Sequence, residues 1–255
     1  MMAKTQLAAQ MYTVRDFTKT PKDLAETLKK VKKIGYDAVQ MSGACAMEYS
    51  ELKKLLDDAG LICCATHIPY EQMRDNPTQV IQDHYAIECK YPAIGGLPGN
   101  YRNADGYGKF AKEATQVGKK LAAGGLYFGY HNHSFELEKF HGRTGLATIY
   151  EDSDPKYVKA EIDTYWIQHG GGDAAEWIDR LKGRIPLVHL KDMTVRDGKI
   201  IMAEVGEGNM NWKSILAACK RAGVEWYIVE QDTCERDPFE SLAISLRNLH
   251  AMGIK

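Results

Sequence analysis

The chain has 255 residues, 44% of them hydrophobic, and its 33 basic and 34 acidic residues leave a formal charge of −1. A chain of this size can bury one substantial core, so we expect a single domain over residues 1–255. The balanced charge argues against nucleic acid or an anionic membrane surface as a partner. No apolar run suits a signal peptide or a membrane span, and the six cysteines form no CxxC pair. Together these features predict a reduced, cytoplasmic protein.

The first half of the chain alternates strand-like and helix-like segments. A strand-like run at 7–12 precedes Thr20 and Pro21, which suit the N-cap and the first position of a helix. Apolar residues then recur at helical spacing until Gly35 ends the run. The same alternation predicts further strands at 36–41, 61–67 and 92–95 and further helices at 50–59, 76–88 and 105–123.

The second half continues this alternation. Strands are expected within 126–136, 160–163, 187–192 and 227–232, and helices near 144–152, 173–182, 212–222 and 238–252. Eight strand–helix units at a spacing of about 30 residues predict a closed (β/α)8 barrel, a TIM barrel. An open doubly wound sheet is the alternative, but no Gly-x-Gly-x-x-Gly follows the first strand, which argues against a dinucleotide site.

Each of the last four predicted strands ends in a side chain that can bind a metal ion. These side chains are His131, Asp163, His189 and Glu230. A lone histidine at a strand end is more often structural, but the carboxyl ends of parallel strands converge, so the four together favour one shared ion. Two imidazoles and two carboxylates suit a divalent cofactor (Mn²⁺, Co²⁺, Mg²⁺, Fe²⁺ or Zn²⁺) better than Ca²⁺.

The motifs of the second half resemble those of a known superfamily. Asp163 is followed 26 residues later by the His189 of Val-His-Leu-Lys-Asp, then by Val-Gly-Glu-Gly-Asn-Met-Asn-Trp at 205–212 and by Val-Glu-Gln-Asp at 229–232. This pattern resembles the xylose isomerase-like TIM-barrel superfamily, most closely its sugar phosphate isomerases/epimerases and inosose dehydratases. The resemblance implies that Asp163, His189 and Glu230 are metal ligands, whereas His131 stands where a glutamate is usual.

The resemblance also implies a type of reaction. In the two-base epimerases of this superfamily, glutamates of strands five and eight each move a proton. With His131 in place of the first glutamate, Glu230 remains as the base, and Lys191 is a candidate acid, although it can equally pair with a carboxylate at the rim. We therefore expect an isomerase, epimerase or dehydratase that acts on a keto-sugar or keto-polyol through a metal-stabilised enediolate.

Of three alternative functions, two stay open and the third is disfavoured by the residues. The same chemistry would support β-elimination of a 3-keto-glycoside. A barrel subunit that binds metal and sugar without activity of its own is the non-enzymatic alternative. The DNA-repair endonucleases of the superfamily need more metal ligands and a basic face, and neither is visible. Only Arg15 and Lys191 are rim candidates for a phosphate, which favours a non-phosphorylated carbohydrate as the small-molecule partner; pairing of barrels into a homo-oligomer stays open.

Other polar and aromatic residues near the predicted strand ends are candidate substrate contacts. Glu161 lies one layer deeper than Asp163 and needs a partner, and the two aspartates at 192 and 232 either orient ligating histidines or form surface ion pairs. Each candidate also has a structural alternative, such as a hydrogen-bonded core histidine, a solvated loop carboxylate or an aromatic ring packed between loops. The candidate substrate-binding residues are His67, His133, Glu136, Glu161, Trp166 and Tyr12.

Overall fold

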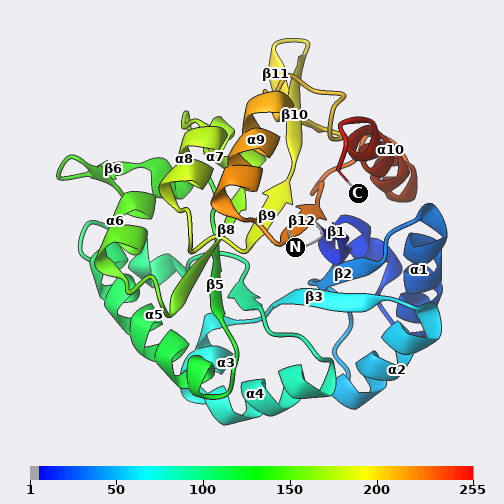
Figure 1. Ribbon diagram of the computed structural model, residues 1–255, viewed down its shortest axis with the longest axis horizontal. Helices are drawn as coiled ribbons and strands as arrows, with labels where there is room; N and C mark the ends of the chain where they lie inside the picture. The colour runs from blue at the N-terminus through cyan, green and yellow to red at the C-terminus, as the bar shows by residue number, and fades with distance from the viewer. Residues whose placement is uncertain (1–5, 255) are drawn as a thin grey trace.

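The computed structural model describes residues 6–254 and contains a closed barrel of eight parallel strands surrounded by helices (Figure 1). The predicted TIM barrel is therefore confirmed. Residues 1–5 and Lys255, which the predicted domain includes, lie outside the described part. Around the barrel the strands follow the order β1-β12-β9-β8-β5-β4-β3-β2. Their bounds are β1 (Gln6–Gln10), β2 (Ala38–Met41), β3 (Ile62–His67), β4 (Pro92–Ile94), β5 (Phe128–His131), β8 (Val158–Asp163), β9 (Leu187–Leu190) and β12 (Trp226–Val229).

The outer helices begin and end where local sequence signals place them. Thr20 caps the first helix by accepting from the backbone N–H of Asp23 at 3.1 Å, and Gly35, with φ of 123°, ends it. None of the helices in residues 6–254 is long and apolar enough to cross a membrane. The outer helices are α1 (Pro21–Ile34), α2 (Tyr49–Ala59), α4 (Pro77–Ala86), α5 (Gly106–Ala123), α6 (Gly145–Asp152), α8 (Ala174–Arg180), α9 (Trp212–Ala222) and α10 (Pro238–Ala251).

Several short elements were not predicted, and they follow the carboxyl ends of the strands. The largest is the hairpin of β10 (Asp192–Arg196) and β11 (Lys199–Ala203), which projects beyond the ring of helices in Figure 1. Apolar runs that continue past a strand end made some predicted strands too long: β1 ends at Gln10, so Tyr12 lies in a 3₁₀ helix. The remaining short elements are η1 (Met11–Phe17), α3 (Tyr70–Asp75), η2 (Gly99–Tyr101), η3 (Phe135–Leu137), β6 (Lys139–Phe140), β7 (Arg143–Thr144) and α7 (Thr164–His169).

The barrel interior changes from apolar to polar along the strands. Side chains two residues apart share a face of a strand, so Leu187 and His189 of β9 point the same way, as do Ile228 and Glu230 at β12. A buried apolar cluster fills the amino end of the barrel and includes Ala8, Ala38, Ala65, Leu187 and Ile228. The next layer holds buried polar residues, which include Gln10, Gln40, Glu161 and His189. The fold therefore places a polar layer under the carboxyl ends of the strands.

Candidate active site

Four buried side chains meet at the carboxyl end of the barrel. They are His131, Asp163, His189 and Glu230, and one nitrogen or oxygen atom from each lies within 4.8 Å of the others. None of the four is more than 5% exposed. His189 Nδ1 lies 2.6 Å from Glu230 Oε2, and His131 Nε2 lies 3.2 Å from Asp163 Oδ2 and 3.9 Å from Glu230 Oε2. The structure thus brings together the four residues that the sequence predicts as metal ligands.

The donor types and the charge of this cluster fit a divalent ion. Two imidazole nitrogens and two carboxylate oxygens form a set that binds Zn²⁺, Co²⁺, Fe²⁺ or Mn²⁺ in proteins. Two buried carboxylates also need positive charge close by, because an uncompensated charge in the interior is costly. His131 Nδ1 has no hydrogen-bond partner among the described residues, so the ring is held only through Nε2, the nitrogen that faces the cluster.

Lys191 supplies one positive charge to the same carboxylates. Its Nζ lies 2.9 Å from Asp163 Oδ2, 3.0 Å from Glu230 Oε2 and 3.1 Å from Asp232 Oδ2, and its side chain is 1% exposed. Burial alone would lower the pKa of Lys191, but the three carboxylates outweigh it and hold that pKa well above its usual value. Lys191 is therefore an ammonium ion inside the site and not a rim lysine in solvent.

The neighbouring ionisable groups respond to this charge. Burial opposes ionisation of Asp163 and Glu230, yet Lys191 lowers the pKa of both carboxyls below their ordinary values. Burial disfavours the charged form of His189, but Glu161 and Glu230 raise its pKa to about 10. Burial and the nearby Glu230 carboxylate raise the pKa of Asp232 to about 6. The site therefore keeps the carboxylates of Asp163 and Glu230 ionised, while the pKa of the outer carboxyl, that of Asp232, lies near neutral pH.

Glu161 lies below this cluster, with no exposed surface. Its carboxylate accepts hydrogen bonds from Gln40 Nε2 at 2.8 Å and His67 Nε2 at 2.7 Å, and it lies 3.2 Å from His189 Nε2. Gln40 in turn accepts from Gln10 Nε2 at 2.9 Å. The partner that a buried carboxylate needs is present, but the two glutamines were not predicted, because a glutamine at the end of a strand has no distinctive signature.

A cavity of about 470 Å³ opens above the cluster. It contains both predicted catalytic residues and four of the six predicted substrate contacts, while Glu136 and Glu161 lie outside it. Ser42 and Gly95 were not predicted; a Cβ atom at Gly95 would lie 3.0 Å from His67 Nδ1, so a small residue is needed there. The lining residues are Tyr12, Ser42, His67, Gly95, His131, His133, Trp166, Lys191, Glu230 and Asp232.

Polar atoms without partners mark this cavity as a binding site. Within residues 6–254, the buried side-chain nitrogen and oxygen atoms that lack any hydrogen-bond partner are His131 Nδ1, His133 Nδ1 and Trp166 Nε1. All three residues line the cavity, and the rings of His133 and Trp166 lie 5.3 Å apart. Because buried polar atoms are normally paired, this concentration indicates a site prepared for a polar ligand.

Two acidic residues hold the surrounding loops. Glu136 has no exposed surface and accepts from Tyr130 Oη at 2.7 Å and from the backbone N–H of His133 at 2.8 Å. Burial raises the pKa of Glu136 to about 7. Asp192 accepts from Trp212 Nε1 at 2.6 Å and from the backbone N–H of Gly206 at 2.9 Å. Neither role expected for Asp192 is observed: within residues 6–254 it has no hydrogen bond to a ligating histidine and no ion pair, because the 205–212 loop folds over it.

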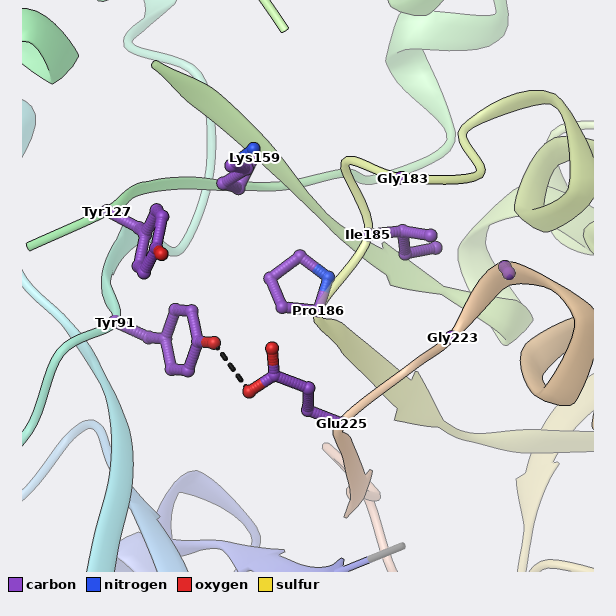
Figure 2. A pocket seen from close by; sticks show the side chains of 9 residues that line it. Tyr91, Tyr127, Lys159, Gly183, Ile185, Pro186, Gly223 and Glu225 are labelled. Carbon is purple, nitrogen blue, oxygen red and sulfur yellow. Dashed lines mark hydrogen bonds between the residues drawn. The ribbon is translucent and has the colours of Figure 1, made fainter. Parts of the chain in front are cut away.

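A second cavity, of about 200 Å³, lies at the amino end of the strands (Figure 2). Its lining residues Tyr91, Tyr127, Pro186 and Glu225 immediately precede β4, β5, β9 and β12. Tyr91 donates to Glu225 at 2.7 Å, as Figure 2 shows, and stacks on Tyr127 with ring centroids 5.2 Å apart. In barrels of this fold the amino end contributes stability and the carboxyl end contributes chemistry, so the first cavity is the candidate active site.

Comparison with known proteins agrees with this geometry. Residues 28–249 match the model of the xylose isomerase-like TIM barrel family. The chain belongs to this family. The resemblance expected from the strand-end motifs is thus confirmed.

Named relatives add detail. The inosose dehydratase of Geobacillus thermodenitrificans is 29% identical over 150 residues, which cover 49% of this chain and 48% of that protein. The chain thus spans about half the length of this curated relative. A sugar phosphate isomerase/epimerase structure from Parabacteroides distasonis has a TM-score of 0.84 at 23% identity and covers 99% of this chain and 96% of its own. The structure of an L-ribulose 3-epimerase has a TM-score of 0.73 at 15% identity, with 98% and 94% covered. These two structures establish the shared fold.

Proposed function

We propose that this protein is a divalent-metal-dependent enzyme that isomerises, epimerises or dehydrates a keto-sugar or keto-polyol through an enediolate. The observation that carries the proposal is the meeting of His131, Asp163, His189 and Glu230 beneath a cavity in whose lining three buried polar atoms lack partners. The family and the inosose dehydratase relatives support the same class of reaction. The free state of all six cysteines is compatible with a reducing, cytoplasmic setting.

The side chains divide the chemistry among them. A divalent ion held by the four-residue cluster would polarise the carbonyl and the adjacent hydroxyl of a substrate, and so acidify the hydrogen on the carbon between them. Glu230 faces the cavity and would take that proton as the general base. Lys191 Nζ, 3.0 Å from Glu230, would donate a hydrogen bond to the developing oxyanion.

Two features of the residues near the cavity restrict the class of substrate. Arg15, a candidate phosphate ligand, already donates to the carbonyls of Tyr12 at 2.9 Å and Asp232 at 3.0 Å. Lys191, the other candidate, is surrounded by three carboxylates. An added phosphate would meet strong repulsion there, so we propose a non-phosphorylated substrate. His67, His133, Trp166 and Tyr12 would contact its hydroxyls and ring.

The experiment measures bound metal and then proton exchange. The purified protein is analysed for metal, dialysed against a chelator and reloaded, and each form is incubated in D₂O with a panel of keto-sugars and keto-cyclitols. We expect deuterium uptake at the carbon next to the carbonyl only in the metal-loaded form, and an uptake about 10²–10⁴-fold slower in Glu230→Gln. Glu204→Gln, which removes a buried carboxylate outside the cavity, is the matched control. Full activity after chelation, or bound metal without uptake from any substrate, would refute the proposed catalysis.

A further inference from the structure

The imidazole of His189 joins two layers of the barrel interior. Its Nδ1 lies 2.6 Å from Glu230 Oε2, on the side of the four-residue cluster. Its Nε2 lies 2.6 Å from Gln40 Oε1 and 3.2 Å from Glu161 Oε1, in the layer below. The ring has no exposed surface, so neither nitrogen can exchange its partner for water without a rearrangement. The group that faces each nitrogen therefore decides which one carries a proton in the neutral ring.

The lower layer is a chain of hydrogen bonds whose direction is fixed at both ends. At one end the backbone N–H of Tyr12, which can only donate, points to Gln10 Oε1 at 3.2 Å. This orients the amide of Gln10 so that its Nε2 donates to Gln40 Oε1 at 2.9 Å. At the other end the carboxylate of Glu161, which can only accept, receives Gln40 Nε2 at 2.8 Å. Both ends require the same orientation of the Gln40 amide, with its oxygen toward His189.

An amide oxygen is an acceptor, so the nitrogen of His189 that faces it must carry a hydrogen. Nδ1 faces the Glu230 carboxylate at 2.6 Å, on the side where a cation would bind, so the proton on Nδ1 is the one that a cation would displace. The ring then keeps its hydrogen on Nε2 and presents the lone pair of Nδ1 to the side where Glu230, His131 and Asp163 converge. We infer that Glu161, acting through Gln40 and directly on His189, is a positioning residue that selects Nδ1 of His189 as the nitrogen offered to the cation. This inference rests on the proposed metal site.

The same argument separates two candidate clusters in the described residues. His67, Glu161 and His189 also lie close enough to hold an ion. There, however, Nε2 of His189 carries a hydrogen, and Nε2 of His67 is occupied by its bond to Glu161 at 2.7 Å. A protonated ring nitrogen has no lone pair for a metal. The lower cluster is therefore a hydrogen-bonded support, and the upper cluster holds the ion.

The test reads the ligating atom directly. Wild-type protein with ¹⁵N-labelled histidine is loaded with ¹¹³Cd²⁺, and long-range ¹H–¹⁵N NMR identifies the protonated and the metal-bound nitrogen of His189. We expect the coupling to cadmium on Nδ1 and the proton on Nε2. Coupling on Nε2 would overturn the inference while leaving the proposed metal site intact. A wild type that binds no ion would overturn both.

A pair of variants then tests Glu161 itself. In Glu161→Gln, Zn²⁺ affinity measured by competition with a chromophoric chelator is expected to fall about 10–100-fold, as for other groups that orient a ligating histidine. Glu204→Gln changes a carboxyl that is 6% exposed and contacts Ser241 and Arg236 rather than this cluster, and it should keep wild-type affinity. If Glu161→Gln does not fold, Gln40→Met breaks the same chain and is expected to weaken Zn²⁺ binding. Affinity within twofold of wild type in a folded variant would remove Glu161 from this role.

Discussion

Lys191 and Glu230 extend from two neighbouring strands of the barrel, and their charged groups lie 3.0 Å apart with both side chains buried. The ammonium of Lys191 shares its carboxylate partners, Asp163 and Glu230, with the proposed cation. The lysine ammonium and a bound metal ion would therefore interact with the same two carboxylates. Their mutual repulsion is large at this depth, because nearby charges interact more strongly in the interior than in water.

Replacement of Lys191 should change metal affinity and turnover in opposite directions. In Lys191→Met we expect Zn²⁺ or Mn²⁺ to bind about tenfold more tightly or better, because a competing cation is lost. Turnover should fall about 10²–10⁴-fold, because the hydrogen bond to the oxyanion is lost as well. Calorimetry and steady-state kinetics measure the two effects. Lys220→Met, on the exposed side of α9, is the control, and unchanged turnover in Lys191→Met would contradict the role given to Lys191.

The histidine that replaces the usual glutamate should set the metal preference. His131→Glu exchanges an imidazole ligand for a carboxylate and leaves three carboxylates and one imidazole in the cluster. Oxygen ligands favour harder ions, so the affinity for Mn²⁺ or Mg²⁺ relative to Zn²⁺ should rise about tenfold or more. Competition binding with both ions measures the ratio. An unchanged ratio would show that His131 is not a ligand.

The pKa of Glu136, about 7 in the folded protein, predicts a dependence of stability on pH. Because its unfolded pKa is lower, near 4.5, the folded state binds the proton more tightly, and stability falls as pH rises from about 4.5 through 7. Glu136→Gln removes this ionisation, so the loss of stability between pH 5 and pH 8, roughly 1–3 kcal/mol in the wild type, should be absent from the variant. Urea unfolding at pH 5 and pH 8 measures the difference. Glu138→Gln, at an exposed position nearby, should leave it unchanged.

Asp192 should be needed for the loop at 205–212. Its two oxygens accept from Trp212 Nε1 and from the backbone N–H groups of Met193, Gly206, Gly208 and Met210. In Asp192→Ala these donors lose their acceptor, and we expect a loss of roughly 2–4 kcal/mol of stability. Limited proteolysis should cut first within this loop. A variant with wild-type stability and protease resistance would show that other contacts hold the loop.

The sequence predicts the barrel and the residues at its centre because both follow from simple geometry. Alternation along a strand places Asp163 and Glu161 on one face, and parallel strands bring Asp163, His189 and Glu230 to one end of the barrel. Pairwise distances could not be predicted, because they depend on the stagger of neighbouring strands. That stagger also places Gln40 beneath His189, where an unremarkable glutamine becomes part of the site.

The direction in which loop side chains point could not be predicted from the sequence either. Glu136 was expected either to reach substrate or to be solvated in a loop, whereas the 3₁₀ turn after β5 directs it inward to Tyr130. Asp192 was expected either to orient a ligating histidine or to form a surface ion pair, yet it starts a hairpin and accepts from the backbone N–H groups of a later loop. Both outcomes depend on tertiary contacts of an irregular backbone, for which no periodic signal exists.

The apolar plug at the amino end of the barrel lies on the opposite side of the four-residue cluster from the cavity. Ala8, Ala38, Leu187 and Ile228 close the far side, and the four-residue cluster lies between this plug and the cavity. A sugar bound in the cavity would consequently lie between the metal ion and bulk water. Ion loading should precede sugar binding, and EDTA should strip metal from sugar-saturated protein more slowly than from free protein.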